Sequence, residues 1–290
     1  MKGWLSAIVV LAIVALTPGC DRAATPPGTS ETRIVTVGGA VTEIVFALGA
    51  GDHVVAVDTS SLHPEAAIRL PKVGYQRQLA AEGLLGMRPT MVIASAEAGP
   101  PAAIDQLRGA GVHVALVDSE TTIEGARARI GKIASILGRD PAPVYASFDR
   151  DLARALAEAA RAREKPRVLA IYSRGGGAMH VFGRDTAVDT LIHLAGAANA
   201  ASAVEGTKAL TAEAVVQTSA DAILVPARGL DSLGGVSGLL KVPGVAETPA
   251  GRARRVIAMD DLLMLGLGPR AGEAALELAR KVHAPDGGGR

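Results

Sequence analysis

The feature that most constrains the fold of this chain is an alternation of short, β-branched apolar runs with segments whose apolar residues recur at helical spacing. Strand-like runs occupy 34–37, 54–57, 91–94 and 112–117 in the first half, and 168–172, 222–225 and 256–259 in the second half. Helical spacing occurs, for example, at 102–108, 187–194 and 271–282. Strands that alternate with helices predict an α/β fold with mainly parallel sheets.

A long helical segment separates the two series. The stretch from Pro141 to Ala162 is rich in Ala, Arg and Glu, and its apolar residues recur every four positions at Val144, Phe148 and Leu152. We therefore expect two Rossmann-like lobes, 33–140 and 164–285, joined by a single long helix over 141–163. A ligand crevice between the lobes is the natural site in such a fold, and a stiff linking helix implies limited closure on the ligand.

The N-terminal segment predicts export. Lys2 precedes an apolar run over 4–16, which is shorter than the roughly 20 residues that span a bilayer and typical of a signal peptide. The run ends at Thr17-Pro18-Gly19-Cys20, which resembles a bacterial lipoprotein signal, although Thr17 departs from the usual Leu. We expect a signal peptide over 1–20, a flexible tether over 21–32, and a periplasmic protein. Cys20 is either a lipidated membrane anchor or an incidental thiol.

Composition excludes several classes of function. Thirty basic against 29 acidic residues give a formal charge of +1, too little for an argument that the chain binds nucleic acid. The sequence contains no G-x-G-x-x-G, P-loop or G-x-S-x-G motif, and the only cysteine lies at the tether, so nothing indicates an enzyme. Six histidines include no H-x-x-x-H pair, so a zinc cluster is not supported, although one gathered from both lobes is not excluded by spacing.

The most informative segment is 71–93, in which a loop carrying Tyr75 leads into a helix and then a strand introduced by a proline. This order resembles the class III solute-binding proteins for iron chelates, haem and cobalamin. Its opening, Gly74-Tyr75-Gln76-Arg77, is similar to the periplasmic haemin-binding branch of that family. Segments 33–48, 178–199 and 259–270 agree, so the resemblance covers about 33–283.

The resemblance implies a monomer that captures haem between its lobes and delivers it to an ABC permease and ATPase complex in the cytoplasmic membrane. Tyr75 is the expected ligand of the haem iron, because a phenolate is a hard anionic donor suited to ferric iron. Arg77 is expected to project to the same side, if the segment is extended, and to hold the phenolate or a haem propionate. His180 is the candidate second ligand from the second lobe, while Tyr172 and Tyr145 suit core or surface positions.

Further roles follow from the same resemblance. Arg228 and Arg174 follow predicted strand ends and are candidates to bind haem propionates. Glu97 and Glu213 lie in opposite lobes and are expected to dock onto permease arginines, since exposed charges favour orientation and rapid encounter. Glu213 could equally stabilise a helix N-terminus. The alternative functions are a ferric siderophore or cobalamin carrier of the same class, and an exported α/β enzyme or structural lipoprotein.

Overall fold

The computed structural model describes residues 32–172, 179–209 and 211–284. Thr32–Arg290 form one compact unit. The predicted signal peptide, most of the predicted tether, Cys20 and Arg174 lie outside the described residues. No helix in the described part of the chain is long and apolar enough to cross a membrane.

The first lobe is built on a four-stranded parallel sheet in the order β2-β1-β3-β4. Side chains alternate across it, so that Ile34 packs on one face while Val35 and Val37 pack on the other. The strands are β1 (Ile34–Val37), β2 (Val54–Val57), β3 (Met91–Ser95) and β4 (His113–Val117). The helices are α1 (Gly39–Ala47), a 3-10 turn (Gly51–His53), α2 (Glu65–Ile68), α3 (Ala81–Gly86), α4 (Pro101–Gly109) and α5 (Ile123–Leu137).

The second lobe has a six-stranded sheet in the order β10-β9-β5-β6-β8, with β7 paired to β5. The strand pairs β10/β9 and β9/β5 are parallel, whereas β5/β6 and β6/β8 are antiparallel. The strands are β5 (Arg167–Tyr172), β6 (His180–Phe182), β7 (Ala198–Asn199), β8 (Thr207–Ala209), β9 (Ala222–Pro226) and β10 (Val256–Met259). The helices are α7 (Ala187–Leu194), α8 (Ala212–Gln217), α9 (Ala227–Ser232), α10 (Gly235–Leu239), α11 (Pro249–Arg252), α12 (Asp261–Leu265) and α13 (Ala271–Val282).

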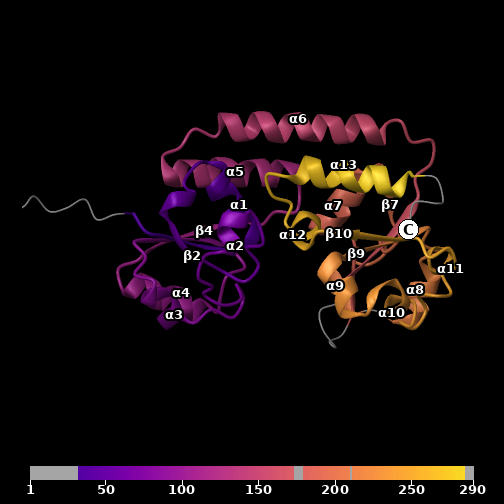
Figure 1. Ribbon diagram of the computed structural model, residues 1–290, viewed down its shortest axis with the longest axis horizontal. Coiled ribbons are helices and arrows are strands. Elements are labelled where there is room, and N and C mark those ends of the chain that lie inside the picture. The colour runs from indigo at the N-terminus through magenta and orange to yellow at the C-terminus, as the bar shows by residue number, and fades with distance from the viewer. Residues whose placement is uncertain (1–31, 173–178, 210, 285–290) are drawn as a thin grey trace, which may run out of the picture. The chain divides into compact units, whose positions relative to one another are not determined.

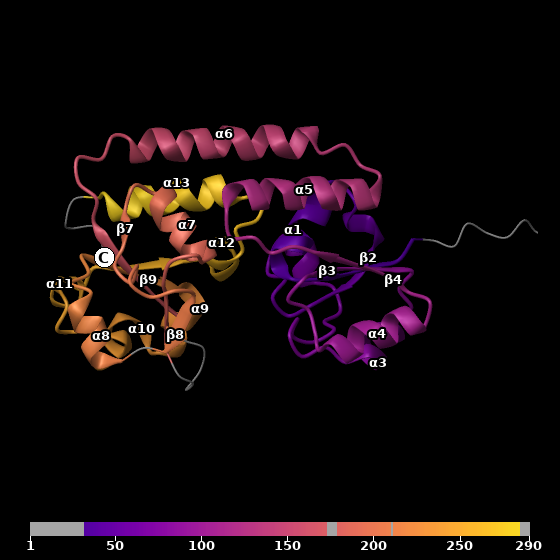
Figure 2. The same cartoon turned by 180° about the vertical axis from the view of Figure 1, so that it is seen from behind.

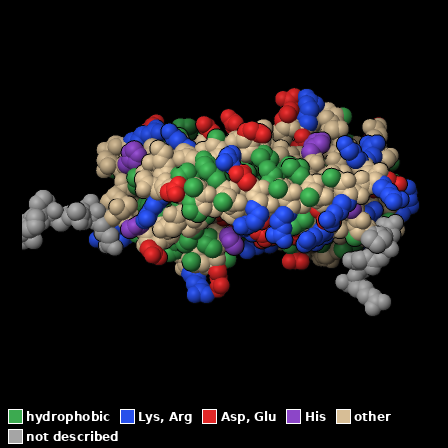
Figure 3. Space-filling view, turned by 90° about the horizontal axis from the view of Figure 1, so that it is seen from above, with side chains coloured by type: hydrophobic (Ala, Val, Ile, Leu, Met, Phe, Trp, Pro, Cys, Tyr) green, Lys and Arg blue, Asp and Glu red, His purple; other side chains and the backbone are tan. Residues whose placement is uncertain are grey.

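Helix α6 (Ala142–Ala159) runs above both lobes, with α5 beneath one end and α13 beneath the other (Figures 1 and 2). Gly272 in α13 allows a close approach, because a Cβ there would lie 2.3 Å from the Leu152 backbone nitrogen in α6. The outer face seen from above carries basic and acidic side chains next to one another (Figure 3). Within and just after α6, Arg150 pairs with Asp151 and Arg161 pairs with Glu158. Such mixed charge makes no basic patch.

The predicted architecture of two Rossmann-like lobes joined by one long helix is confirmed, and every predicted strand is present. Two predictions were incomplete. Helix α5 was not recognised, because Gly125 and Gly131 lower helix propensity and interrupt its apolar pattern. The antiparallel strands β6 and β8 were also missed, since β8 is exposed throughout and carries no apolar alternation.

The two lobes share packing as well as a linking helix. Leu267 and Ala271 follow α12 of the second lobe, but both are buried in the core cluster of the first lobe beside α1 and α5. Glu43 of α1 also forms a buried ion pair with Arg270, at the start of α13. Apolar contact and a buried charge pair at one junction oppose large movements of one lobe against the other.

Candidate functional site

A cleft with a volume of about 470 Å³ lies where the carboxyl ends of the strands of both sheets meet. In the first lobe it is lined by residues that follow β1, β2, β3 and β4, among them Gly38, Ser60, Glu97 and Thr121. The second lobe contributes the end of β5, the start of α7 and helix α12. This is the position that the sequence analysis expected for a ligand.

A buried polar network holds the first-lobe wall at the start of α1. Asp58 is fully buried, and its carboxylate accepts bonds from the Gly38 backbone N–H at 2.9 Å and from the Ser60 and Ser61 hydroxyls at 2.6 and 2.7 Å. Gly38 has a φ of 102°, which favours glycine, so the chain turns sharply from β1 into the helix. The backbone at this end of α1 therefore lies at the cleft surface in a fixed conformation.

Tyr75 lies on the cleft wall at the start of a tight turn. The Gln78 backbone N–H donates to the Tyr75 carbonyl at 2.8 Å, and the Gly99 N–H donates to the Gln76 carbonyl at 2.9 Å, which ties the turn to the loop after β3. The tyrosine is 37% exposed, and its hydroxyl forms no hydrogen bond with any described residue. A phenol in this position is free to bind a ligand in the cleft.

Arg77 also lines the cleft, but its backbone lies in a turn, whereas an extended segment was expected. Its guanidinium pairs with the Glu97 carboxylate, and this hydrogen bond, helped by the negative field of Glu97, raises the pKa of Arg77. Glu97, which the sequence analysis assigned to the permease, thus lies on the cleft wall as the partner of Arg77. Its docking role stays a prediction.

The second-lobe wall presents an aromatic face. Tyr172 and Phe182 both line the cleft, with ring centroids 6.0 Å apart in an edge-to-face arrangement. The expectation that Tyr172 is a core or surface residue was wrong, because β5 ends at the cleft and the antiparallel strand β6 pairs beside it. His180 pairs directly with Tyr172 and lies two residues from Phe182. These three side chains therefore share one face of the sheet, although His180 is not itself part of the cleft wall.

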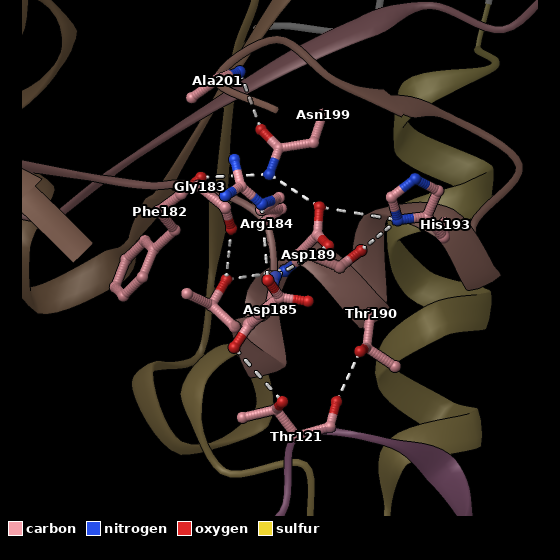
Figure 4. A network of polar contacts seen from close by, with 11 residues as sticks. Thr121, Phe182, Gly183, Arg184, Asp185, Asp189, Thr190, His193, Asn199 and Ala201 are labelled. Carbon is pink, nitrogen blue, oxygen red and sulfur yellow. Dashed lines mark hydrogen bonds and ion pairs between the residues drawn. The ribbon is translucent and has the colours of Figure 1, made fainter. Parts of the chain in front are cut away.

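A polar network fixes this wall to α7 (Figure 4). Buried Asn199 donates to the Phe182 carbonyl at 3.1 Å and to the Asp189 carboxylate at 2.8 Å, and it accepts from the Ala201 N–H at 2.9 Å. At the bottom of Figure 4, the Thr190 hydroxyl donates to the carbonyl of Thr121 across the junction between the lobes. The network holds β6 and the start of α7 in place at the cleft.

The remaining predicted residues lie elsewhere. Arg228 has an exposed side chain outside the cleft wall, and its backbone N–H donates to Asp261 at 3.1 Å. Tyr145 packs on α5, with Arg127 over its ring at 4.1 Å. Glu213 is exposed in the first turn of α8, where Gln217 donates to its carboxylate. In the described part of the chain, no cluster of three His, Cys, Asp or Glu residues could hold a metal ion.

The sequence analysis did not nominate two charged residues whose positions in the structure are notable, Glu82 and Arg129. Glu82 is the second residue of α3, as Glu213 is of α8, and each short helix leads to a parallel strand of its own lobe. Glu82 is exposed, and neither glutamate has a salt bridge with a described residue. Arg129 is a buried cation on the cleft wall. Glu82 could have been found by matching helix starts between the lobes, whereas the burial of Arg129 is a tertiary property.

These features are those of a two-lobed binding protein with a ligand cleft at its strand ends. A family model described as "Periplasmic binding protein" matches residues 34–263, and the chain belongs to that family. The solved structure of the periplasmic heme-binding protein RhuT from Roseiflexus sp. RS-1, in apo form, is 43% identical, has a TM-score of 0.85, and matches over 87% of this chain and 98% of its own.

Two further relatives agree with this assignment. The periplasmic heme-binding protein BhuT, solved in complex with two hemes, is 44% identical with a TM-score of 0.81, and the match covers 87% of this chain and 97% of that chain. An uncharacterized ABC transporter substrate-binding lipoprotein, YvrC of Bacillus subtilis, is 28% identical over 88% of this chain and 80% of its own length.

Proposed function

We propose that this chain captures haem in the cleft between its lobes and delivers it to an ABC importer. The observation that carries the proposal is the phenol of Tyr75, which is exposed and has no hydrogen bond with a described residue, on the wall of a cleft whose opposite wall is aromatic. The two structures of heme-binding proteins, similar over nearly their whole length, support haem as the ligand in preference to a ferric siderophore or cobalamin.

Tyr75 binds the iron of ferric haem through its phenolate oxygen. The iron and Arg77, which lines the same cleft, supply positive charge that favours the anionic phenolate. The aromatic pair of Tyr172 and Phe182 contacts the porphyrin face or edge from the second lobe. His180 is the candidate second iron ligand. Because it lies beside the cleft wall and not in it, either its side chain must move into the cleft or the bound porphyrin must extend to it.

Titration of the purified chain with haemin tests this function. Tyr75→Phe keeps the ring and removes only the oxygen, so it should abolish the phenolate-to-iron charge-transfer band without unfolding the protein. Tyr145→Phe is the matched control, because Tyr145 lies on α6 away from the cleft, and its spectrum should equal that of the unmodified chain. An unchanged spectrum in Tyr75→Phe would show that another residue binds the iron, and His180→Ala would then be the variant to compare.

Delivery requires contact with a permease through both lobes. Glu82 and Glu213 support this role best, since both are exposed and start matching helices, whereas Glu97 is paired with Arg77. Charge reversal at Glu82 and Glu213 should abolish haem uptake by cells and leave haemin binding intact. If reversal at Glu97 alone does so, the docking site of the first lobe is Glu97.

Export and anchoring complete the proposal. The signal peptide over 1–20 directs the chain to the periplasm, and lipidation of Cys20 tethers it to a membrane through 21–32. Cys20→Ser should release the mature protein from the membrane fraction. The lobe boundaries 33–140 and 164–285, with the helix 141–163, are supported by the two sheets and by α6. The protein acts as a monomer and has no enzymatic activity. Arg174 is a candidate accessory cation for haem, whereas Arg228, exposed outside the cleft wall, is the weaker candidate.

A further inference from the structure

Arg129 is the most deeply buried cation of the described part of the cleft wall. It projects from the middle of α5, is only 7% exposed, and lines the cleft wall. Its guanidinium donates to the Asp118 carbonyl at 2.8 Å and the Glu120 carbonyl at 2.9 Å. A longer bond of 3.4 Å reaches the Leu267 carbonyl in the second lobe. Arg129 thus lies where the two lobes meet.

No carboxylate of the described residues forms an ion pair with Arg129. Its three hydrogen-bond acceptors are all backbone carbonyls, and a guanidinium carries five N–H donors, so two remain without an acceptor in the described protein. Burial lowers the pKa of Arg129, and the fields of Glu120, Glu97 and Asp118 only partly oppose this effect. A buried charge without a paired counter-ion is costly, and that cost is relieved when an anion binds.

Most other charged groups of the described cleft wall have partners. Arg77 pairs with Glu97, Asp185 lies 3.5 Å from the Arg184 guanidinium, and buried Asp261 accepts from a backbone N–H. Glu120 also lines the cleft, and its carboxylate has no hydrogen bond or ion pair with a described residue; its negative field partly opposes the lowering of the Arg129 pKa by burial. Arg129 is therefore the cation of the described cleft wall whose charge no protein carboxylate pairs with directly. Its planar donor fork matches a carboxylate better than it matches a single oxygen.

We propose that Arg129 is the anion receptor of the cleft, and that it selects ligands carrying a carboxylate directed between the lobes. The assignment rests on the proposed function, in which that group is a propionate of the porphyrin. One propionate replaces solvent at the two free N–H groups, while the bonds to the three carbonyls keep the guanidinium in place. The iron bond of Tyr75 and the carboxylate bond of Arg129 are then separate contributions to affinity.

Three probes separate these contributions: haemin, haemin dimethyl ester, and iron-free protoporphyrin IX. The unmodified chain should bind haemin at least about tenfold more tightly than the ester, because a hydrogen-bonded charge pair contributes that much or more. Arg129→Met should lose this preference, because its affinity for haemin should fall while its affinity for the ester stays the same. Its affinity for protoporphyrin IX should also fall. Tyr75→Phe should leave the affinity for protoporphyrin IX unchanged.

The controls make each outcome decisive. Arg127→Met removes an arginine from the same helix, where it pairs with Asp149 and Tyr145 outside the cleft, and should keep the preference for haemin. Arg129→Lys keeps the charge without the fork and should keep part of the preference, which also covers the case in which Arg129→Met does not fold. The assignment would be overturned if both Arg129 variants bound haemin and the ester more weakly than the unmodified chain by the same factor, or if neither variant bound them more weakly. Failure of the unmodified chain to bind any of the three porphyrins would refute haem capture itself, and the assignment with it.

Discussion

Glu43 and Arg270 form a buried ion pair that connects the first helix of one lobe to the start of the last helix of the other. The Arg270 Nε–H donates to one carboxylate oxygen of Glu43 at 2.9 Å, and its Nη2 donates to the same oxygen. Glu43 is only 5% exposed. Burial raises its pKa to about 7, an effect that the attraction of Arg270 reduces without cancelling and that Asp260 and Glu273 reinforce.

The pair predicts a pH-dependent stability. The folded-state pKa of Glu43 lies above its ordinary value of 4.5, so the folded chain holds this proton more tightly than the unfolded chain does. The contribution of Glu43 is then fully present below about pH 4.5 and is lost as the pH rises through about 7. Urea unfolding of Glu43→Gln across this range should show a shallower fall in stability than the unmodified chain. Glu205→Gln, an exposed control whose charge does not act on the pKa of Glu43, should keep the steeper fall, and parallel curves for Glu43→Gln and the unmodified chain would contradict the prediction.

The Arg77–Glu97 pair predicts coupled effects on ligand binding. Both side chains are largely exposed, so breaking the pair should change the free energy of unfolding by less than about 1 kcal/mol. Glu97→Gln should instead free Arg77 for the ligand and strengthen haemin binding, whereas Arg77→Ala should weaken it. In the Arg77→Ala background Glu97→Gln should then have no effect, as a double-mutant cycle by fluorescence titration can measure. Additive effects would mean that the two residues act separately.

The close approach of α6 and α13 predicts a packing defect. Gly272→Ala would place a methyl group 2.3 Å from a backbone atom of α6, so one of the two helices must shift. We expect a loss of about 1–3 kcal/mol in the free energy of unfolding. Gly86→Ala is the control, because nothing lies within 4 Å of a Cβ there. It should leave the melting temperature unchanged or slightly higher, and equal behaviour of the two variants would exclude tight packing at Gly272.

The network around Asn199 predicts a contrast between buried and exposed polar contacts. Asn199→Ala removes a buried side chain and leaves the part-buried Phe182 carbonyl without its side-chain donor, so it should cost about 1–3 kcal/mol. Glu205→Ala removes an exposed ion pair with Arg184 in the same region and should cost less than about 1 kcal/mol. Denaturant unfolding gives both values. A neutral Asn199→Ala would show that the network does not stabilise the wall.

Shared packing between the lobes predicts limited closure. Leu267 and Ala271 would have to leave the core of the first lobe before the lobes could rotate far, and α6 resists bending. Small-angle scattering should therefore give nearly the same radius of gyration with and without haemin. A large contraction on binding would contradict this.

Much of the architecture could be predicted because it depends on local patterns. The strands 34–37 and 256–259 are apolar runs, and the rhythm of Val144, Phe148 and Leu152 identified the long helix. Both signals come from side chains a few positions apart. Tyr75 could be nominated because its segment, Gly74-Tyr75-Gln76-Arg77, resembles the haemin-binding branch of the family, and the structure brings it to the cleft wall together with Arg77.

The sequence by itself determined the two α/β lobes, the long helix and the loop that carries Tyr75. Only the tertiary structure decided which charges meet, because contact and burial depend on residues far apart in the chain. Glu97 follows Arg77 by twenty residues and pairs with it, while Arg270 reaches Glu43 from the other end of the chain. Arg129 is a buried cation that contacts the Leu267 carbonyl, 138 residues further along the chain, and its burial could not be predicted because the desolvation of a charge is set by its whole surroundings.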